Sequence, residues 1–321
     1  MSSDLVLVAD VGGTHSRFGT VRAGSTEPNE VEAFDNEDFG NLTEVAAHYL
    51  EKTGARPARG VFAVAGPMKG GTVHLTNRRG WSFQPSAMAV ELRMAHIDVI
   101  NDFAALAWSL PHIPVTDLLP IGAPGVQAGG TKLVLGPGTG LGVAALIEHD
   151  GMTTVVPSEG GHVGLAPTTE REAAVYGAIK KLYGYVSAEM VVSGPGLARL
   201  DRALAALEGQ DIAERSGKDV SEAARAGEKR AAEAQDLFEA ALARFAGDMA
   251  LAFLALGGVY LYGGVAQKTV DMLEKHLFRQ RFENKPPHQK LLAGMGTVLI
   301  TMPAPALLGC AARAARHRVR P

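Results

Sequence analysis

The sequence has one cysteine, few aromatic side chains and no long apolar run. Cys310 alone excludes an internal disulfide and a cysteine-rich zinc site, and it fits a reducing compartment such as the cytoplasm. It lies in an apolar helical pattern, so we expect a buried packing role. The longest apolar stretch, 249–262, contains glycines and is too short to span a bilayer. The amino-terminal residues lack the basic region of a secretory signal, so none is expected.

Charge of one sign is also lacking, since the formal net charge of the 321 residues is −3. Such a balance provides no long-range field, so we expect neither nucleic acid nor a membrane surface as a partner. The mixed charges of 211–233 are interpreted as a solvated helical face. The length favours two domains over one.

The first informative stretch runs from Leu5 to Val21. A branched apolar run is followed by Asp10-Val11-Gly12-Gly13-Thr14 and then by a second alternating run, which predicts a β-hairpin. Adjacent glycines permit positive φ and leave bare amides that could contact a phosphate. Asp10 could reach a hydrated Mg²⁺, and the threonine hydroxyl could bond a phosphate. An ordinary hairpin explains this segment alone equally well.

A second segment of the same kind favours the phosphate-binding interpretation over an ordinary hairpin. Residues 132–147 again place a small-residue turn with a threonine, Gly138-Thr139-Gly140, between two apolar runs. A third glycine turn, Gly263-Gly264, follows the apolar run 258–262. This repetition is typical of a duplicated nucleotide-binding half. The P-loop and dinucleotide-binding patterns do not fit the glycine spacing.

The rest of the chain alternates predicted strands and helices, which favours an α/β layer with parallel strands. The Pro- and Gly-rich segment 111–131 is interpreted as the connection between domains. The other expected elements are a helix over 42–52, a strand over 61–66, a hairpin over 72–83, a helix capped by Ser86 and reaching about His96, a strand over 97–100, a helix over 103–110, helices over 169–183, 187–192, 196–208 and about 220–256, a strand over 297–302 and a helix from about 305.

Asn101 and Asp102 follow a predicted strand, at the edge where α/β folds bind ligands. Asp102 is a candidate general base, although its type and position, taken alone, favour a cap of the helix that follows. Glu159 and His162 share a glycine-rich loop, and Glu189 follows in a later helix. Side chains of these types suit the hydroxyls of a sugar. A zinc site is the other interpretation, but no HExxH motif or cysteine accompanies them.

Five motifs occur in order: DVGGT at 10–14, INDF at 100–103, GPGTGLG at 136–142, EGGH at 159–162 and YGG at 262–264. Together they resemble the bacterial ATP-dependent glucokinase family, the non-ROK type within the hexokinase and actin-like superfamily. The resemblance implies a two-domain actin-like (ribonuclease H-like) α/β fold with an inter-domain cleft for glucose and MgATP. A small domain, 1–112, would be completed by the helix within 303–321, and 113–302 would form the large domain.

The resemblance also implies roles for individual residues in a reaction that transfers the γ-phosphate of ATP to the 6-hydroxyl of glucose. Asp102 would be the base, and Asp10 would hold Mg²⁺ through water. The sugar contacts would be Asn101, Asp102, Glu159, His162, Glu189 and, less directly, Asn77. The nucleotide contacts would be Ala9, Asp10, Val11, Gly12, Gly13, Thr14, Gly138, Thr139, Gly140, Gly263 and Gly264. A cytoplasmic homodimer would be usual for the family.

Three positions depart from the family pattern: Ala9, His15 and Pro137. None of them removes a hydroxyl, carboxylate or amide that the mechanism needs. A kinase for another hexose, a non-catalytic sugar sensor and an actin-like assembly protein stay open as alternatives. The sensor is less favoured because the first strand begins at Leu5, which leaves no room for a DNA-binding helix-turn-helix.

Overall fold

The computed structural model describes residues 4–316 except 67, 77, 79, 214 and 270–274. The chain divides into two compact units, the first made of residues 1–115 and 302–321 and the second of residues 116–301. Each unit contains a mixed β-sheet with helices packed on it, in agreement with the predicted α/β class.

The sheet of the first unit has the strand order β3-β2-β1-β4-β8. β1 and β2 are antiparallel, which confirms the first hairpin, whereas β1, β4 and β8 are parallel. The apolar run of β1 is buried on both faces of the sheet, as a continuous run of branched residues predicts. The strands are β1 (Leu5–Val11), β2 (His15–Arg22), β3 (Asn29–Asp35), β4 (Arg59–Val64) and β8 (His96–Asn101).

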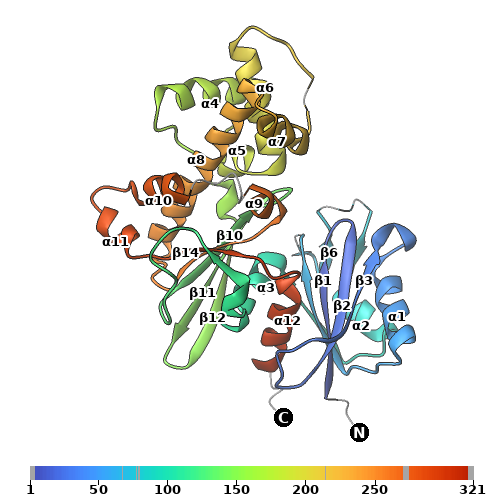
Figure 1. Ribbon diagram of the computed structural model, residues 1–321. Helices are drawn as coiled ribbons and strands as arrows, with labels where there is room; N and C mark the ends of the chain where they lie inside the picture. The colour runs from blue at the N-terminus through green and yellow to red at the C-terminus, as the bar shows by residue number, and fades with distance from the viewer. Residues whose placement is uncertain are drawn as a thin grey trace. The chain divides into compact units, whose positions relative to one another are not determined.

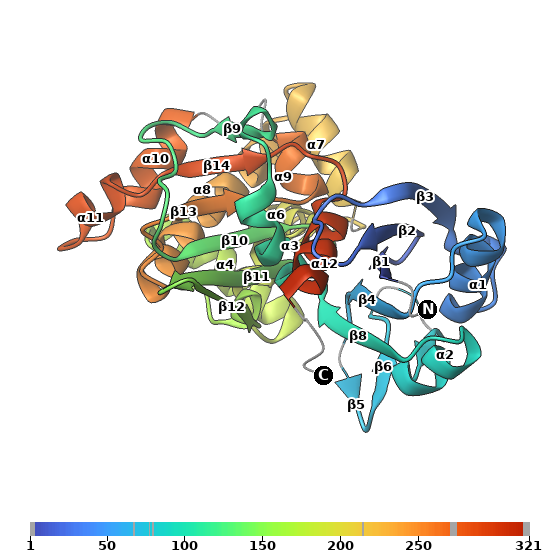
Figure 2. The ribbon, with the colours of Figure 1, turned by 90° about the horizontal axis from the view of Figure 1, so that it is seen from below.

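Helices cover both faces of this sheet, with α1 and α2 on one side and α3 and α12 on the other (Figure 2). They are α1 (Leu42–Thr53), α2 (Pro85–Glu91), α3 (Asp102–Ser109) and α12 (Pro305–Arg316). α1 begins at an Asn41 cap and ends at Gly54, whose φ of 68° is the left-handed conformation that glycine adopts at helix ends. The predicted helix over 42–52 is therefore confirmed.

Helix α12 packs closely on α3 and β1. A Cβ at Gly309 would lie 1.7 Å from the carbonyl oxygen of Ala105, so only glycine allows this approach. The next residue, Cys310, is buried and its Sγ donates to the carbonyl of Ala9 at 3.4 Å. Its complete burial confirms the packing role predicted for it and raises the pKa of the thiol.

One helix of the first unit differs from its prediction. Helix α2 has Gln84 at its N-cap position, without a side-chain cap bond, and it ends at Glu91. Ser86 is the second helical residue because Pro85 takes the first position, which suits a residue without an N–H. The predicted hairpin over 72–83 is a small separate sheet of β5 (Met68–Lys69), β6 (Thr72–His74) and β7 (Ser82–Phe83).

The sheet of the second unit has the order β12-β11-β10-β13-β14-β9. The antiparallel pair β10 and β11 confirms the second hairpin. The segment 111–131 is not a plain connection, since β9 pairs with β14 at the sheet edge, where Pro120 is tolerated. The strands are β9 (Leu118–Pro120), β10 (Lys132–Pro137), β11 (Leu141–His149), β12 (Met152–Ser158), β13 (Gly258–Leu261) and β14 (Thr297–Ile300).

Helices α4, α6 and α7 gather around one end of the long helix α8 (Figure 1). The helix predicted over about 220–256 is two helices, because Gly227 has a φ of 86° and ends the first. The helices are α4 (Glu170–Tyr183), α5 (Ala188–Val191), α6 (Gly194–Leu207), α7 (Gly217–Arg225), α8 (Lys229–Ala252), α9 (Gly264–Thr269), α10 (Lys275–Glu283) and α11 (Gln289–Ala293). Within the described residues, no helix is both long enough and apolar enough to cross a bilayer.

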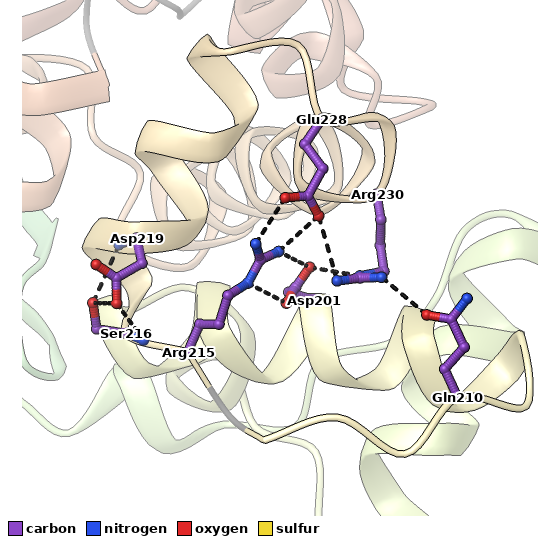
Figure 3. A network of polar contacts seen from close by, with 7 residues as sticks. All are labelled: Asp201, Gln210, Arg215, Ser216, Asp219, Glu228 and Arg230. Atoms are coloured by element: carbon purple, nitrogen blue, oxygen red, sulfur yellow. Dashed lines mark hydrogen bonds and ion pairs between the residues drawn. The ribbon is translucent and has the colours of Figure 1, made fainter.

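A network of ion pairs ties the loop before α7 to α6 and α8 (Figure 3). Asp201 on α6 is 1% exposed, and Arg215 donates two hydrogen bonds to it, at 2.7 and 3.1 Å. Arg230 donates to the same carboxylate at 2.9 Å, and Glu228 accepts two further bonds from Arg215. A buried carboxylate is tolerated when it is paired in this way, so the network fixes the start of α7.

Candidate active site

The first glycine turn connects β1 to β2 in the first unit. The amide of Gly12 donates to the carbonyl of His15 at 3.0 Å, which closes the turn. Neither Gly12 nor Gly13 uses the positive φ that adjacent glycines permit; a Cβ at Gly12 would lie 3.1 Å from the His15 carbonyl oxygen. Close backbone approach explains this glycine. Thr14 is exposed at the tip of the turn.

Asp10 precedes this turn and pairs across the strands with Arg17, whose Nη1 lies 3.9 Å from its Oδ2. Its side chain is 20% exposed. Burial raises the pKa of the Asp10 carboxyl to about 6; the charge of Arg17 opposes this rise and that of Asp102 adds to it. The positive charge near Asp10 is therefore too small to offset the effect of burial on the pKa of its carboxyl.

Asn101 and Asp102 lie at the same edge of that sheet. In the ladder Val11 aligns with Val64, and Val64 aligns with Asn101, so the ends of the three parallel strands form one row. Asn101 caps α3, because its Oδ1 accepts from the amides of Phe103 at 2.9 Å and Ala104 at 3.2 Å. Asp102 is half-buried in the first turn of α3, and its Oδ1 accepts from the amide of Phe103 at 2.9 Å.

The second glycine turn connects β10 to β11 in the second unit. The amide of Gly138 donates to the carbonyl of Gly140 at 2.8 Å, and Thr139 is exposed between them. The carbonyl of Gly138 accepts from the amide of Gly194 at the start of α6, at 2.9 Å. A Cβ at Gly217 would lie 2.2 Å from the carbonyl oxygen of Gly194. The start of α7 therefore packs on the start of α6, which bonds to this turn.

The third glycine turn lies beside the second. Gly263 has a φ of 125°, and a Cβ there would lie 2.5 Å from the carbonyl oxygen of Pro137. At Gly136, a Cβ would lie 1.4 Å from the carbonyl oxygen of Tyr262. These contacts require glycine, and they bring the start of α9 at Gly264 next to the turn 138–140.

Glu189 joins the second glycine turn to the loop 159–162. Its Oε2 accepts from the amide of Leu141 at 2.9 Å and lies 3.8 Å from Nδ1 of His162. A Cβ at Gly140 would lie 2.6 Å from the same oxygen. Glu159 is exposed, and its carbonyl accepts from the amide of His162 at 3.0 Å. The second unit therefore gathers a carboxylate, an imidazole and a glycine turn.

The model of the glucokinase family matches residues 7–317 of this chain. The chain belongs to the glucokinase family. The glucokinase of Chelativorans sp. is 39% identical over 311 residues, covering 96% of this chain and 91% of that one. The glucokinase of Nitrobacter hamburgensis is 38% identical over 310 residues and covers 96% of each chain.

The comparison with solved structures leads to the same family. The crystal structure of a glucokinase from an Antarctic psychrotroph superposes with a TM-score of 0.87 at 35% identity and covers 97% of this chain and 98% of that one. The fold is thus the actin-like ATPase fold predicted from the five motifs, and the activity is the ATP-dependent phosphorylation of glucose.

For two of the residues predicted to bind the nucleotide, the structure limits the contact to the main chain. Ala9 and Val11 are buried, so only their main chains can contact a nucleotide. Asn77 lies outside the described residues.

Asn36 was missed by the sequence analysis: it is 0% exposed and bonds to the first glycine turn. Its only signal in the sequence is a polar residue between a strand and a helix.

The carboxylates of the site bear on whether it can hold a magnesium ion. Among the described residues, no group of three or more His, Cys, Asp or Glu side chains forms a ready-made cage. Mg²⁺ in kinases usually keeps several waters and takes one or two carboxylates together with phosphate oxygens. Asp10, a single carboxylate beside a bare glycine turn, fits that donor set.

Proposed function

We propose that this chain transfers the γ-phosphate of ATP to the 6-hydroxyl of glucose with Asp102 as the general base. The observation that carries the proposal is the cap of α3: Asn101 performs it, so Asp102 is not needed for capping. Asp102 is half-buried at the sheet edge where parallel strands end. In α/β folds this edge binds the ligand.

A sugar hydroxyl becomes a better nucleophile when a positioned carboxylate accepts its proton as the oxygen attacks phosphorus in line. The bond between Oδ1 of Asp102 and the amide of Phe103 orients this carboxylate. Asp102 accepts the proton, and the new bond joins the sugar oxygen to the γ-phosphorus while the bond to the β-phosphate oxygen breaks.

The two glycine turns cradle phosphates in this proposal. Gly12, Gly13 and Thr14 form one turn, and Gly138, Thr139 and Gly140 form the other; each exposes a threonine hydroxyl next to backbone amides. Gly263 and Gly264 contact the nucleoside, and Ala9 and Val11 contribute main-chain contacts.

Glucose is held by groups that donate and accept. The cap uses the acceptor Oδ1 of Asn101, so Nδ2 is the atom that donates to a sugar oxygen. His162 and Glu189 already lie together and bind neighbouring hydroxyls. Glu159 extends this set from the same loop, and Asn77 contributes a less direct contact.

Asp10 would hold Mg²⁺ through a water, and the ion would neutralise charge on the phosphates. The high pKa of Asp10 supports this role, because a nearby cation favours the ionised carboxylate.

The test is a coupled assay of glucose 6-phosphate formation from MgATP, run beside mannose, fructose and N-acetylglucosamine. We expect turnover to favour glucose, and turnover that favours another sugar would contradict the proposed substrate. Asp102→Asn should lower kcat by about 100-fold or more while calorimetry still detects glucose binding.

Asp98→Asn is the matched control, since Asp98 lies on β8, the strand that leads to Asp102, and pairs with Arg313 at 3.2 Å. It should keep kcat within a few-fold of the unmodified enzyme. An Asp102→Asn enzyme with normal turnover would exclude Asp102 as the base.

We also propose a cytoplasmic homodimer. The family resemblance supports the dimer, and the single buried Cys310 supports a reducing compartment. Light scattering on the purified protein tests the dimer, and cell fractionation tests the cytoplasmic location.

A further inference from the structure

We propose that Asn36 is a positioning residue for the nucleotide phosphates, which turns the carbonyl groups of the first glycine turn away from the phosphate. The inference rests on the proposed phosphate-binding role of that turn. Asn36 follows β3 and lies in the short 3₁₀ turn Asn36–Asp38, away from every motif of the sequence.

Three consecutive carbonyl groups of the turn are bonded to Asn36. Its Nδ2 donates to the carbonyl of Gly12 at 2.9 Å and to that of Gly13 at 3.2 Å. Its backbone amide donates to the carbonyl of Thr14 at 2.8 Å. Two carbonyl acceptors can be met only by the NH₂ of the side-chain amide, which fixes the orientation of that group.

This arrangement determines where the amides of the turn point. In a planar trans peptide the C=O and the following N–H point in opposite directions. Because the carbonyls of Gly12 and Gly13 point at Asn36, the amides of Gly13 and Thr14 point away from it. Within the described part of the chain, neither amide donates a hydrogen bond. Successive amides that point to one side form an anion-binding concavity.

Asn36 itself cannot turn away. It is 0% exposed, and its Oδ1 accepts from the hydroxyl of the buried Ser16 at 2.7 Å. Its carbonyl accepts from Nη2 of Arg78 at 2.7 Å. The guanidinium of Arg78 lies 4.5 Å from the centre of the Trp81 ring. Every polar group of Asn36 is therefore bonded, as a buried polar side chain requires.

An aspartate at position 36 tests this arrangement with almost no change of shape. An ionised carboxylate only accepts hydrogen bonds, so it cannot bond the carbonyls of Gly12 and Gly13. The turn would then rotate or loosen, and its amides would no longer be aligned for a phosphate. The residues proposed to bind glucose would keep their positions.

The experiment is calorimetry with MgADP and, separately, with glucose. We expect Asn36→Asp to weaken MgADP binding about tenfold or more and to leave glucose affinity within about twofold. Asn29→Asp makes the same chemical change at the start of β3, the strand that precedes Asn36, where the side chain is exposed and donates to the carbonyl of Glu27. It should leave both affinities unchanged.

If Asn36→Asp does not fold, Asn36→Ser decides. Serine is neutral and its single O–H can serve one carbonyl, so we expect about a threefold to tenfold loss of MgADP affinity. Unchanged MgADP affinity in a folded variant overturns the inference, as does an equal loss of glucose affinity, which would indicate a merely structural role.

The proposed function is judged separately, by glucose phosphorylation in the unmodified enzyme. An inactive enzyme that binds MgADP, with weaker binding in the variant, supports Asn36 and contradicts the function. An active enzyme with an unaffected variant contradicts Asn36 alone.

Discussion

Replacing Asp10 with asparagine should stabilise the fold above about pH 6 while it removes activity. Burial is the main reason that the pKa of Asp10 rises from 3.8 to about 6; Arg17 offsets part of this and Asp102 adds to it. Since one pKa unit corresponds to about 1.4 kcal/mol, ionising Asp10 in the folded state costs about 3 kcal/mol. Asparagine has nearly the same shape and no charge, so the variant avoids this cost.

The sign of the pH dependence follows from linkage. The folded-state pKa is the higher one, so the folded protein holds the proton between about pH 4 and pH 6 while the unfolded chain has released it. The stabilisation from Asp10 is complete below about pH 4 and is lost as pH rises through about 6. We expect Asp10→Asn to exceed the unmodified protein by up to about 3 kcal/mol at about pH 8, where the effect of Arg17 is already contained in the pKa, and by about half as much at about pH 5.

Urea unfolding of both proteins without ligands at these two pH values measures the effect. The control is Asp38→Asn, an exposed carboxylate in the turn that follows β3, expected to change stability by less than about 0.5 kcal/mol. A gap between Asp10→Asn and the unmodified protein that is absent at about pH 8, or equally large at about pH 5, would refute the reasoning.

Four glycine substitutions give further predictions. Gly140→Ala should raise the KM for glucose about tenfold in steady-state kinetics, because the added Cβ displaces the Glu189 carboxylate. Gly138→Ala, which has open space around its Cβ, should leave the KM for glucose unchanged. Gly309→Ala should lower the free energy of unfolding by about 1–3 kcal/mol or more, because its Cβ meets a backbone carbonyl of α3. Gly177→Ala, on the exposed side of α4 with no neighbour within 4 Å, should raise it by about 0.5–1 kcal/mol in the same urea experiment.

Elements whose signals are local could be predicted from the sequence. The hairpin of β10 and β11 follows from two apolar runs around a glycine turn, and α1 follows from its spacing and from Gly54. The cap at Ser86 was wrong because a proline next to it takes the first helical position. Strand β9 was missed because a three-residue edge strand has no periodicity of its own, and only its pairing with β14 defines it.

In the candidate site, too, features with a local signal could be predicted and contacts between distant residues could not. Asp10, Asp102 and Glu189 can be named from their types and places in motifs, because a carboxylate after a strand or in a polar loop is a recognisable pattern. The partner of Glu189 was not predictable: it is the amide of Leu141, which lies 48 positions earlier. A backbone amide has no sequence signature.

The two repeated glycine turns are supported by different groups. In the first unit the Asn36 side chain donates to carbonyl groups, and in the second the Glu189 carboxylate accepts from an amide while the Gly194 amide donates to a carbonyl. A turn can be held from either side of its peptide planes, so duplication constrains the turn residues and leaves the supporting residue open. The glycines of both turns were therefore visible as a repeat in the sequence, whereas their supports became apparent only when the chain was folded.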